Sequence, residues 1–276
     1  MEFSVAVALV LFAAGAVAGV MGALLGVGGG IFMVPFLSLG LHLPMQTAVG
    51  ISLTTVIATS SVVSAGTAGR RLINVRLGMV LEIATTAGAV LGAWVAAMLV
   101  ERTLRALFGL VAAASGVAML RRVNRRNVIA DPGAEPGTLG GRFEDGESGG
   151  EVVYRVRQLP VGLAVSFAAG SVSTLLGLGG GILKVPALTA WCGVPLRASA
   201  ATSAFMIGVT ATAGAVIYFA RGDVVPWMAA ASVLGVLTGS QSGLRIGERA
   251  RALDLKLLMA AVLFLVSFLM LARAFT

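Results

Sequence analysis

Four stretches of the sequence are almost free of charge. Residues 5–25, 80–100, 159–178 and 255–272 each contain at most one charged side chain. A helix of roughly 20 apolar residues, rising about 1.5 Å per residue, crosses a hydrocarbon core about 30 Å thick. Charged residues make up only 12% of the chain and hydrophobic residues 58%, whereas about a quarter of a soluble domain is charged. The sequence therefore predicts an all-α polytopic membrane protein.

Composition also excludes several classes of function. The formal net charge is +8, but the arginines cluster between the apolar stretches, which is typical of topology signals and lipid head-group contacts rather than of nucleic-acid binding. One cysteine, Cys192, and one histidine, His42, are too few for an internal disulfide, a thiolate cluster or a histidine-rich metal site. We expect no metal, no cofactor, no nucleic-acid partner and, with His42 as the one candidate base, no enzyme.

A glycine-rich motif occurs twice. The stretch GVGGGIFMVPFL begins at Gly26, and GLGGGILKVPAL begins at Gly177, 151 residues later. The same register continues at the pairs Pro44 and Pro195, Gln46 and Arg197, Ser52 and Ser203, and Arg70 and Arg221. Internal duplication in an apolar chain is typical of secondary transporters built from two repeats. It divides the chain into a first transmembrane repeat (1–120), a linker (121–158) and a second transmembrane repeat (159–276).

The linker differs in composition from both halves. It is rich in glycine, proline and charge, with an acidic centre and basic flanks. No part of it is periodic or apolar enough to fold alone, so we expect a flexible linker.

Each half contains four long apolar segments and a short one. The long segments are 3–25, 45–68, 77–99 and 103–120, then 159–176, 196–219, 225–244 and 254–273; the short ones are 30–41 and 181–191. A short segment alone does not span the core, so each is a glycine-broken half-helix or a re-entrant hairpin. If the short segments cross the membrane, the repeats are inverted and most Lys and Arg residues lie on one side, as is typical of cytoplasmic loops. If they do not cross, the repeats are parallel and the bias of Lys and Arg toward one side is weak. We favour inverted repeats, about eight full spans plus two short segments, and a cytoplasmic linker.

The glycine triplets predict breaks in the membrane helices. Each glycine costs a helix about 1 kcal/mol relative to alanine, and irregular backbone at membrane depth is tolerated only inside protein or beside a watery cavity. We predict that amide groups at the two breaks bind an anion near the membrane midplane, with close helix packing as the alternative. The residues assigned to this site are Gly28, Gly29, Gly30, Pro35, Gly179, Gly180, Gly181 and Pro186.

Two basic residues of the second half join the candidate substrate-binding set. Lys184 stands where the first motif has Met33. A lysine inside an apolar segment indicates function, and snorkelling to the interface is the alternative. Arg197 occupies the slot of Gln46 and has the geometry to hold an oxyanion, with an ordinary loop-end arginine as the alternative. Gln46 is included as its counterpart.

Polar side chains inside the long segments complete the set. Ser52, Thr202 and Ser203 lie one to two turns into the helices that follow the short segments, where their hydroxyls are candidates to line a substrate path. Bonding to their own helix carbonyls is the commoner role of such hydroxyls. Glu82 is the acid well inside an apolar stretch; it is our candidate for carrying a coupling proton, with reach to the interface as the alternative.

The two glycine motifs, with the following AVGIS and AATS, resemble the sulfite exporter TauE/SafE family of membrane permeases over nearly the whole chain. The resemblance implies transport of small sulfur-containing anions, such as sulfite or organosulfonates, across a bacterial-type cytoplasmic membrane. It assigns the motif glycines and prolines, and the polar residues Ser52, Thr202 and Ser203, to the site. The long acidic linker departs from the family pattern, and GIS replaces the more usual small-Thr-Ser in the first half.

We therefore expect a multi-pass secondary transporter, an exporter of a small sulfur-containing oxyanion that works by alternating access between two repeats. Its expected partners are the anionic substrate and membrane lipid, and a homodimer is left open. The alternatives are an anion channel of the same fold and a non-transporting membrane scaffold.

Overall fold

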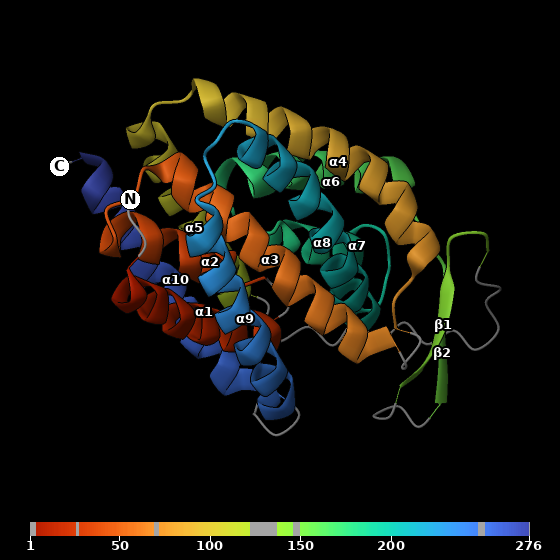
Figure 1. The fold of residues 1–276 in the computed structure, drawn as a ribbon. Helices are drawn as coiled ribbons and strands as arrows, with labels where there is room; N and C mark the ends of the chain where they lie inside the picture. The colour runs from red at the N-terminus through yellow and green to blue at the C-terminus, as the bar shows by residue number, and fades with distance from the viewer. Residues whose placement is uncertain are drawn as a thin grey trace.

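The computed structural model describes residues 4–25, 28–68, 72–121, 137–145, 150–247 and 252–275. These residues are mostly helical (Figure 1). The helices are α1 (Val5–Leu25), α2 (Gly30–Pro35) with a π-helical continuation (Phe36–Gly40), α3 (Met45–Ala68), α4 (Val75–Met98), α5 (Glu101–Arg121), α6 (Leu159–Leu176), α7 (Gly181–Ala190), α8 (Leu196–Ala220), α9 (Pro226–Gly247) and α10 (Ala252–Phe275). The predicted segments coincide with these helices to within a few residues.

Several helices are long and apolar enough to cross a membrane. Within the described residues, five meet both conditions: α1, α3, α4, α6 and α8. Shorter apolar helices cover Gly30–Gly40 and Ala260–Ala274. The prediction of a helical, multi-pass membrane protein is confirmed, while the number of spans stays a prediction.

Helices from the two halves pack against each other in pairs. The first helix, α1, lies along α9, and α6 lies along α4 (Figure 1). Glycines allow these backbones to approach closely, since a Cβ at Gly239 would overlap the Ala16 carbonyl and a Cβ at Gly88 would overlap the Phe167 carbonyl. The remaining large contacts join α3 to α8 and α5 to α10. The halves are therefore interlocked rather than separate bundles.

The linker contains a β-hairpin where we expected no regular structure. Strand β1 (Gly141–Asp145) pairs antiparallel with β2 (Gly150–Tyr154). A two-stranded hairpin alone is only marginally stable in water, but Phe143 and Tyr154 pack against Leu77 of α4 and Cys192 after α7. The flexible-linker prediction is therefore corrected for the hairpin, because an apolar surface formed by distant helices holds it. Residues 122–136 and 146–149 of the linker lie outside the described residues.

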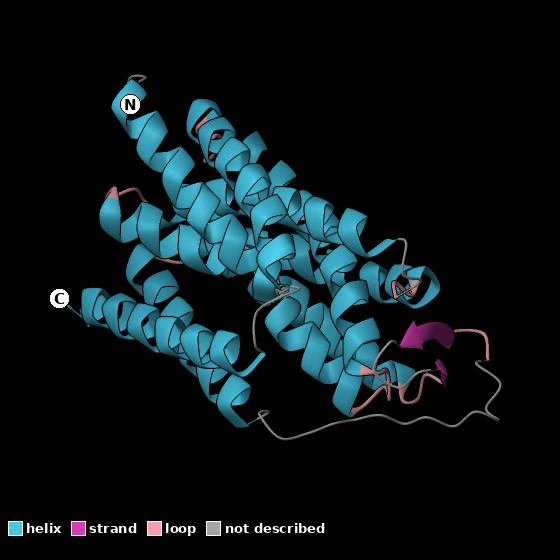
Figure 2. Cartoon of the chain, turned by 90° about the horizontal axis from the view of Figure 1, so that it is seen from below, coloured by secondary structure: helices cyan, strands magenta, loops and turns pink. Residues whose placement is uncertain are grey.

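The hairpin and the chain ends lie at opposite ends of the bundle. In two perpendicular views the strands project from one end, whereas α1 begins and α10 finishes at the other (Figures 1 and 2). Asn74, just before α4, holds the hairpin in place: its Nδ2 donates to Tyr154 Oη at 3.0 Å and to the Leu139 carbonyl at 2.8 Å. The same side chain caps α4 by accepting from the Leu77 amide.

Candidate functional site

The two glycine motifs are in direct contact. Ser52 of α3 lies between them, with its Oγ 2.9 Å from the Gly177 carbonyl oxygen and 3.3 Å from that of Gly30. One hydroxyl proton serves one of these acceptors at a time. A Cβ at Gly30 would overlap the Gly177 carbonyl, so this junction admits only glycine. Two segments far apart in the sequence thus meet through backbone atoms in the protein interior.

The second motif breaks its helix as the glycine triplet predicts. Helix α6 ends at Leu176 and is capped by Gly177, whose φ of 71° is left-handed, and α7 begins after Gly180, whose φ is 67°. Both conformations favour glycine because it has no Cβ. The amides of Leu183 and Lys184 bond to the Gly180 carbonyl at 3.2 Å. The amides before them, at the start of α7, have no intrahelical acceptor because no turn of the helix precedes them.

A buried ion pair lies one turn beyond this break. Lys184 of α7 places its Nζ 3.6 Å from Glu82 Oε2 of α4, and the two side chains are only 1% and 6% exposed. Thr210 of α8 lies between them: Lys184 Nζ donates to Thr210 Oγ1 at 2.9 Å, and Thr210 Oγ1 donates to Glu82 Oε1 at 2.6 Å. Burying a lone charge costs several kcal/mol, so pairing is what makes each charge tolerable here. We call Lys184, Thr210 and Glu82 the charged triad.

Sequence reasoning singled out Lys184 and Glu82 separately and did not foresee their contact. It did not select Thr210 at all. One signal could have predicted the contact between Lys184 and Glu82. Each is a lone charge inside an apolar segment, the two charges are opposite in sign, and such charges tend to pair. Thr210 had no distinguishing signal among the many hydroxyls of α8.

Other predicted site residues lie away from the charged triad. Gln46, at the start of α3, donates from Nε2 to the Leu99 carbonyl at 3.5 Å. Arg197 is exposed in the first turn of α8, about 20 Å along that helix from Thr210. Thr202 accepts from the Asn74 amide at 2.9 Å, near the hairpin.

The remaining predicted residues belong to the motifs or follow them. Ser203 is fully buried, and its Oγ has no hydrogen-bond partner among the described residues. Gly29 precedes α2 with an ordinary φ of −66°, and Pro35 is buried at the end of that helix. Gly179 and Gly181 lie in the break before α7 and at its start, and Pro186 lies within α7.

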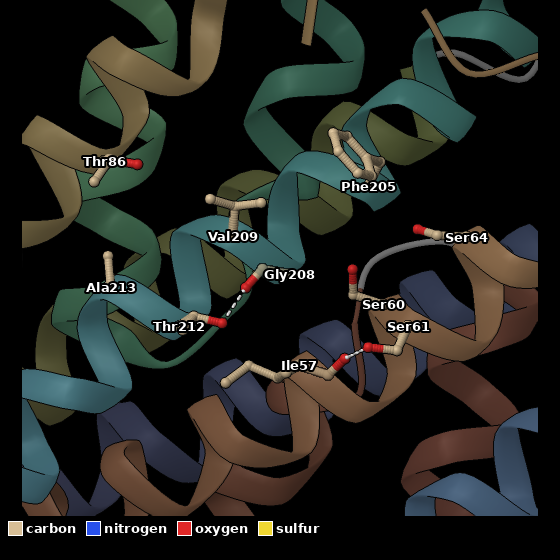
Figure 3. Close-up of a pocket in the computed structure, with 10 residues that line it drawn as sticks. All are labelled: Ile57, Ser60, Ser61, Ser64, Thr86, Phe205, Gly208, Val209, Thr212 and Ala213. Atoms are coloured by element: carbon tan, nitrogen blue, oxygen red, sulfur yellow. Dashed lines mark hydrogen bonds between the residues drawn. The ribbon is translucent and has the colours of Figure 1, made fainter. Parts of the chain in front are cut away.

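A pocket of about 620 Å³ lies between α3 and α8 and reaches α4. Figure 3 shows the residues of α3 and α8 facing each other across it, with Thr86 of α4 at its edge. Its polar groups are hydroxyls, and the complete lining is Ile57, Ser60, Ser61, Ser64, Thr86, Phe205, Gly208, Val209, Thr212 and Ala213. Thr86 Oγ1 lies 3.5 Å from Glu82 Oε1. The pocket wall therefore contacts the carboxylate of the charged triad.

A much smaller cavity connects the first glycine motif to the same region. It measures about 10 Å³, close to the space of one water molecule. Gly28 and Thr59 line it, and Ser60 lines both this cavity and the large pocket. Of the motif glycines described, Gly28 is thus the one that borders open space near the pocket.

Comparisons with known proteins agree with this architecture. A family model described as sulfite exporter TauE/SafE matches residues 11–270. The chain is also 28% identical over 265 residues to the probable membrane transporter protein YunE of Bacillus subtilis (strain 168), covering 94% of this chain and 95% of that protein. No solved structure gives a significant match.

Proposed function

Because the chain belongs to the sulfite exporter TauE/SafE family of membrane transporters, we propose that it exports a small sulfur-containing oxyanion, such as sulfite or an organosulfonate, across the cytoplasmic membrane as a secondary transporter. The observation that carries this proposal is the buried ammonium of Lys184, one turn past a break in a membrane helix. An ammonium in such surroundings forms charge-assisted hydrogen bonds with an oxyanion, which are about twice as strong as neutral ones.

A purely structural role accounts poorly for this lysine. Lys184 and Glu82 are the buried charged residues in the part of the chain that the structure describes. Replacing a buried ion pair by apolar residues of similar volume is often neutral or stabilising. The first half has buried Met33 at the position of Lys184, so the motif folds without a charge there. The cost of the charge is best explained by substrate binding.

The packing of the helices supports two inverted repeats. The contact of Gly239 with the Ala16 carbonyl and that of Gly88 with the Phe167 carbonyl are related by the same shift of 151 residues that relates the motifs. The hairpin between the halves lies at the end of the bundle opposite the start of α1 and the end of α10 (Figures 1 and 2). Each half would then begin on one side of the membrane and end on the other, which corresponds to inverted repeats rather than parallel ones. Such repeats work by alternating access.

The large pocket is the proposed entry to the site. Its hydroxyls, among them Ser60, Ser61 and Thr212, donate to backbone carbonyls in the structure and would rotate to donate to the oxygens of a sulfite or sulfonate group. Its volume of about 620 Å³ exceeds the size of such an ion, so the substrate enters hydrated. It then exchanges water for the Lys184 ammonium deeper in the protein.

The test is transport by purified protein in proteoliposomes, with sulfite and short sulfonates as substrates. Lys184→Met is expected to lower flux by roughly 10- to 100-fold, because a charge-assisted hydrogen bond contributes about 1.5–3 kcal/mol. Met33→Leu changes the counterpart position and is expected to leave flux unchanged. Saturable flux with trans-stimulation is expected of a carrier, and a channel shows neither. Equal flux in wild type and Lys184→Met would contradict the proposal.

A further inference from the structure

The charged triad forms the inner end of a polar chain that starts at the pocket. Thr86 contributes to the pocket wall and lies 3.5 Å from Glu82 Oε1. Glu82 accepts from Thr210 at 2.6 Å, and Thr210 accepts from Lys184 at 2.9 Å. Each step is within hydrogen-bonding reach, so side-chain hydroxyls connect the pocket wall to Glu82.

Ionised Glu82 is an anion paired with the Lys184 ammonium, and the proposed substrate is an anion that would pair with the same ammonium. Binding the substrate beside an ionised Glu82 would leave a net negative charge in a site that is almost fully buried, and an unpaired buried charge is expensive. Protonating Glu82 restores neutrality and frees Lys184 for the incoming anion.

This inference rests on the proposed transport function. We propose that ionised Glu82 competes with the substrate for the Lys184 ammonium. A proton delivered past Thr86 neutralises Glu82, and the substrate then takes its place beside Lys184. Thr210 is the switching hydroxyl. It donates to Glu82 at 2.6 Å in the structure, and the Met206 carbonyl at 2.9 Å is its alternative acceptor once Glu82 is protonated. One proton therefore accompanies each monovalent anion, and their movement together is electroneutral.

Among the described residues, Lys184 is the charged group paired with Glu82. The other charged residue of α4 is Arg76, in the first turn of that helix. Helix α6, which packs along α4, has no titratable side chain between Leu159 and Leu176. Lys184 is the titratable residue of α7. The titratable residues of the other elements that pack against α4 lie toward the ends of the bundle: Arg197, Tyr218 and Arg221 on or beside α8, and Tyr154 and Cys192 in the cluster at the start of α4.

The test uses proteoliposomes that carry a pH-sensitive dye in the lumen and a gradient of methanesulfonate. A sulfonate stays ionised at every pH of interest, so any proton that moves is moved by the protein. Wild type is expected to acidify the lumen as the sulfonate enters, with about one proton per anion and no response to an imposed membrane potential. Glu82→Gln is expected to exchange sulfonate without acidification and with a flux that is independent of pH.

A second pair of variants keeps the proposal testable if Glu82→Gln does not fold. Thr86→Val leaves the ion pair intact but removes the hydroxyl between the pocket and Glu82; it is expected to slow coupled flux several-fold and to shift its pH profile. Thr238→Val is the matched control, because Thr238 lies on α9 outside the pocket and its hydroxyl bonds to its own helix at the Gly235 carbonyl. It should behave as wild type.

The possible failures are distinguishable. If Lys184→Met is inactive and wild type transports sulfonate without moving protons, the coupling is wrong and the transport function stands. The coupling is also overturned if Glu82→Gln keeps the wild-type ratio of protons to sulfonate, or if Thr86→Val matches Thr238→Val in its pH profile. If Lys184→Met transports as fast as wild type, the proposed function itself fails.

Discussion

The two halves of the chain carry the same motif but differ in charge at two of three equivalent positions. Lys184, Thr210 and Glu82 correspond by the shift of 151 residues to Met33, Thr59 and Val233. Met33 and Thr59 are fully buried, and Thr59 bonds to the Thr55 carbonyl of its own helix at 3.0 Å. The ion pair joins the two halves, and the equivalent position in each half carries a neutral side chain. Under the proposed function the charges serve the substrate, and the equivalent neutral positions suggest that the fold does not need them.

Breaking the ion pair from one side is expected to have the largest effect on stability. Glu82→Ala leaves the Lys184 ammonium buried without its partner, and removal of one member of such a pair costs about 3–5 kcal/mol. The double variant Lys184→Met/Glu82→Val copies the neutral residues found at the equivalent positions, Met33 and Val233. Its free energy of unfolding should lie within about 1 kcal/mol of the wild-type value. Unfolding of both variants in detergent checks this. A double variant as unstable as Glu82→Ala would mean that the fold depends on the charges.

The contact between the glycine motifs predicts the next largest effect. Gly30→Ala places a methyl group against the Gly177 carbonyl, and overpacking of this kind costs roughly 1–3 kcal/mol. Gly40→Ala is the control, because its Cβ would lie 3.6 Å from the nearest atom of Phe36, an ordinary contact. Thermal unfolding of the purified variants measures the difference. Equal stability of the two alanine variants would mean that the motifs separate at little cost.

The two equivalent serines predict a smaller asymmetry. Ser52 bridges the glycine motifs, whereas the described residues offer Ser203 Oγ no hydrogen-bond partner. Ser52→Ala is expected to destabilise the protein by about 1 kcal/mol, the net contribution of a typical hydrogen bond, and Ser203→Ala by close to zero. Denaturant unfolding of both variants tests this. A larger loss at Ser203 would show that its hydroxyl has a partner in the folded protein.

The sequence predicted the helices well because length and apolarity alone decide them. The segment predicted at 45–68 is observed as Met45–Ala68, and the short segment predicted at 181–191 as Gly181–Ala190. A glycine triplet predicts a break wherever it occurs in such a segment, since the cost lies in the local backbone. These features depend on neighbouring residues in the chain, which the sequence displays directly.

Features that depend on packing between distant segments were not predicted. The hairpin forms because Phe143 and Tyr154 find an apolar surface made by Leu77 and Cys192, and nothing in the linker indicates that surface. Likewise, Glu82 meets Lys184 because α4, α7 and α8 converge there. The register of the repeat gives no hint of this contact, since the equivalent residues Met33 and Val233 carry no charge.

The central claim is that the Lys184 ammonium binds the transported anion, and the neutral double variant tests it most directly. Lys184→Met/Glu82→Val is compared with wild type for trans-stimulated sulfite flux in proteoliposomes, after its unfolding has been shown to match. The account predicts a folded protein that transports at least about tenfold more slowly. Wild-type flux from a chain without either charge would contradict it.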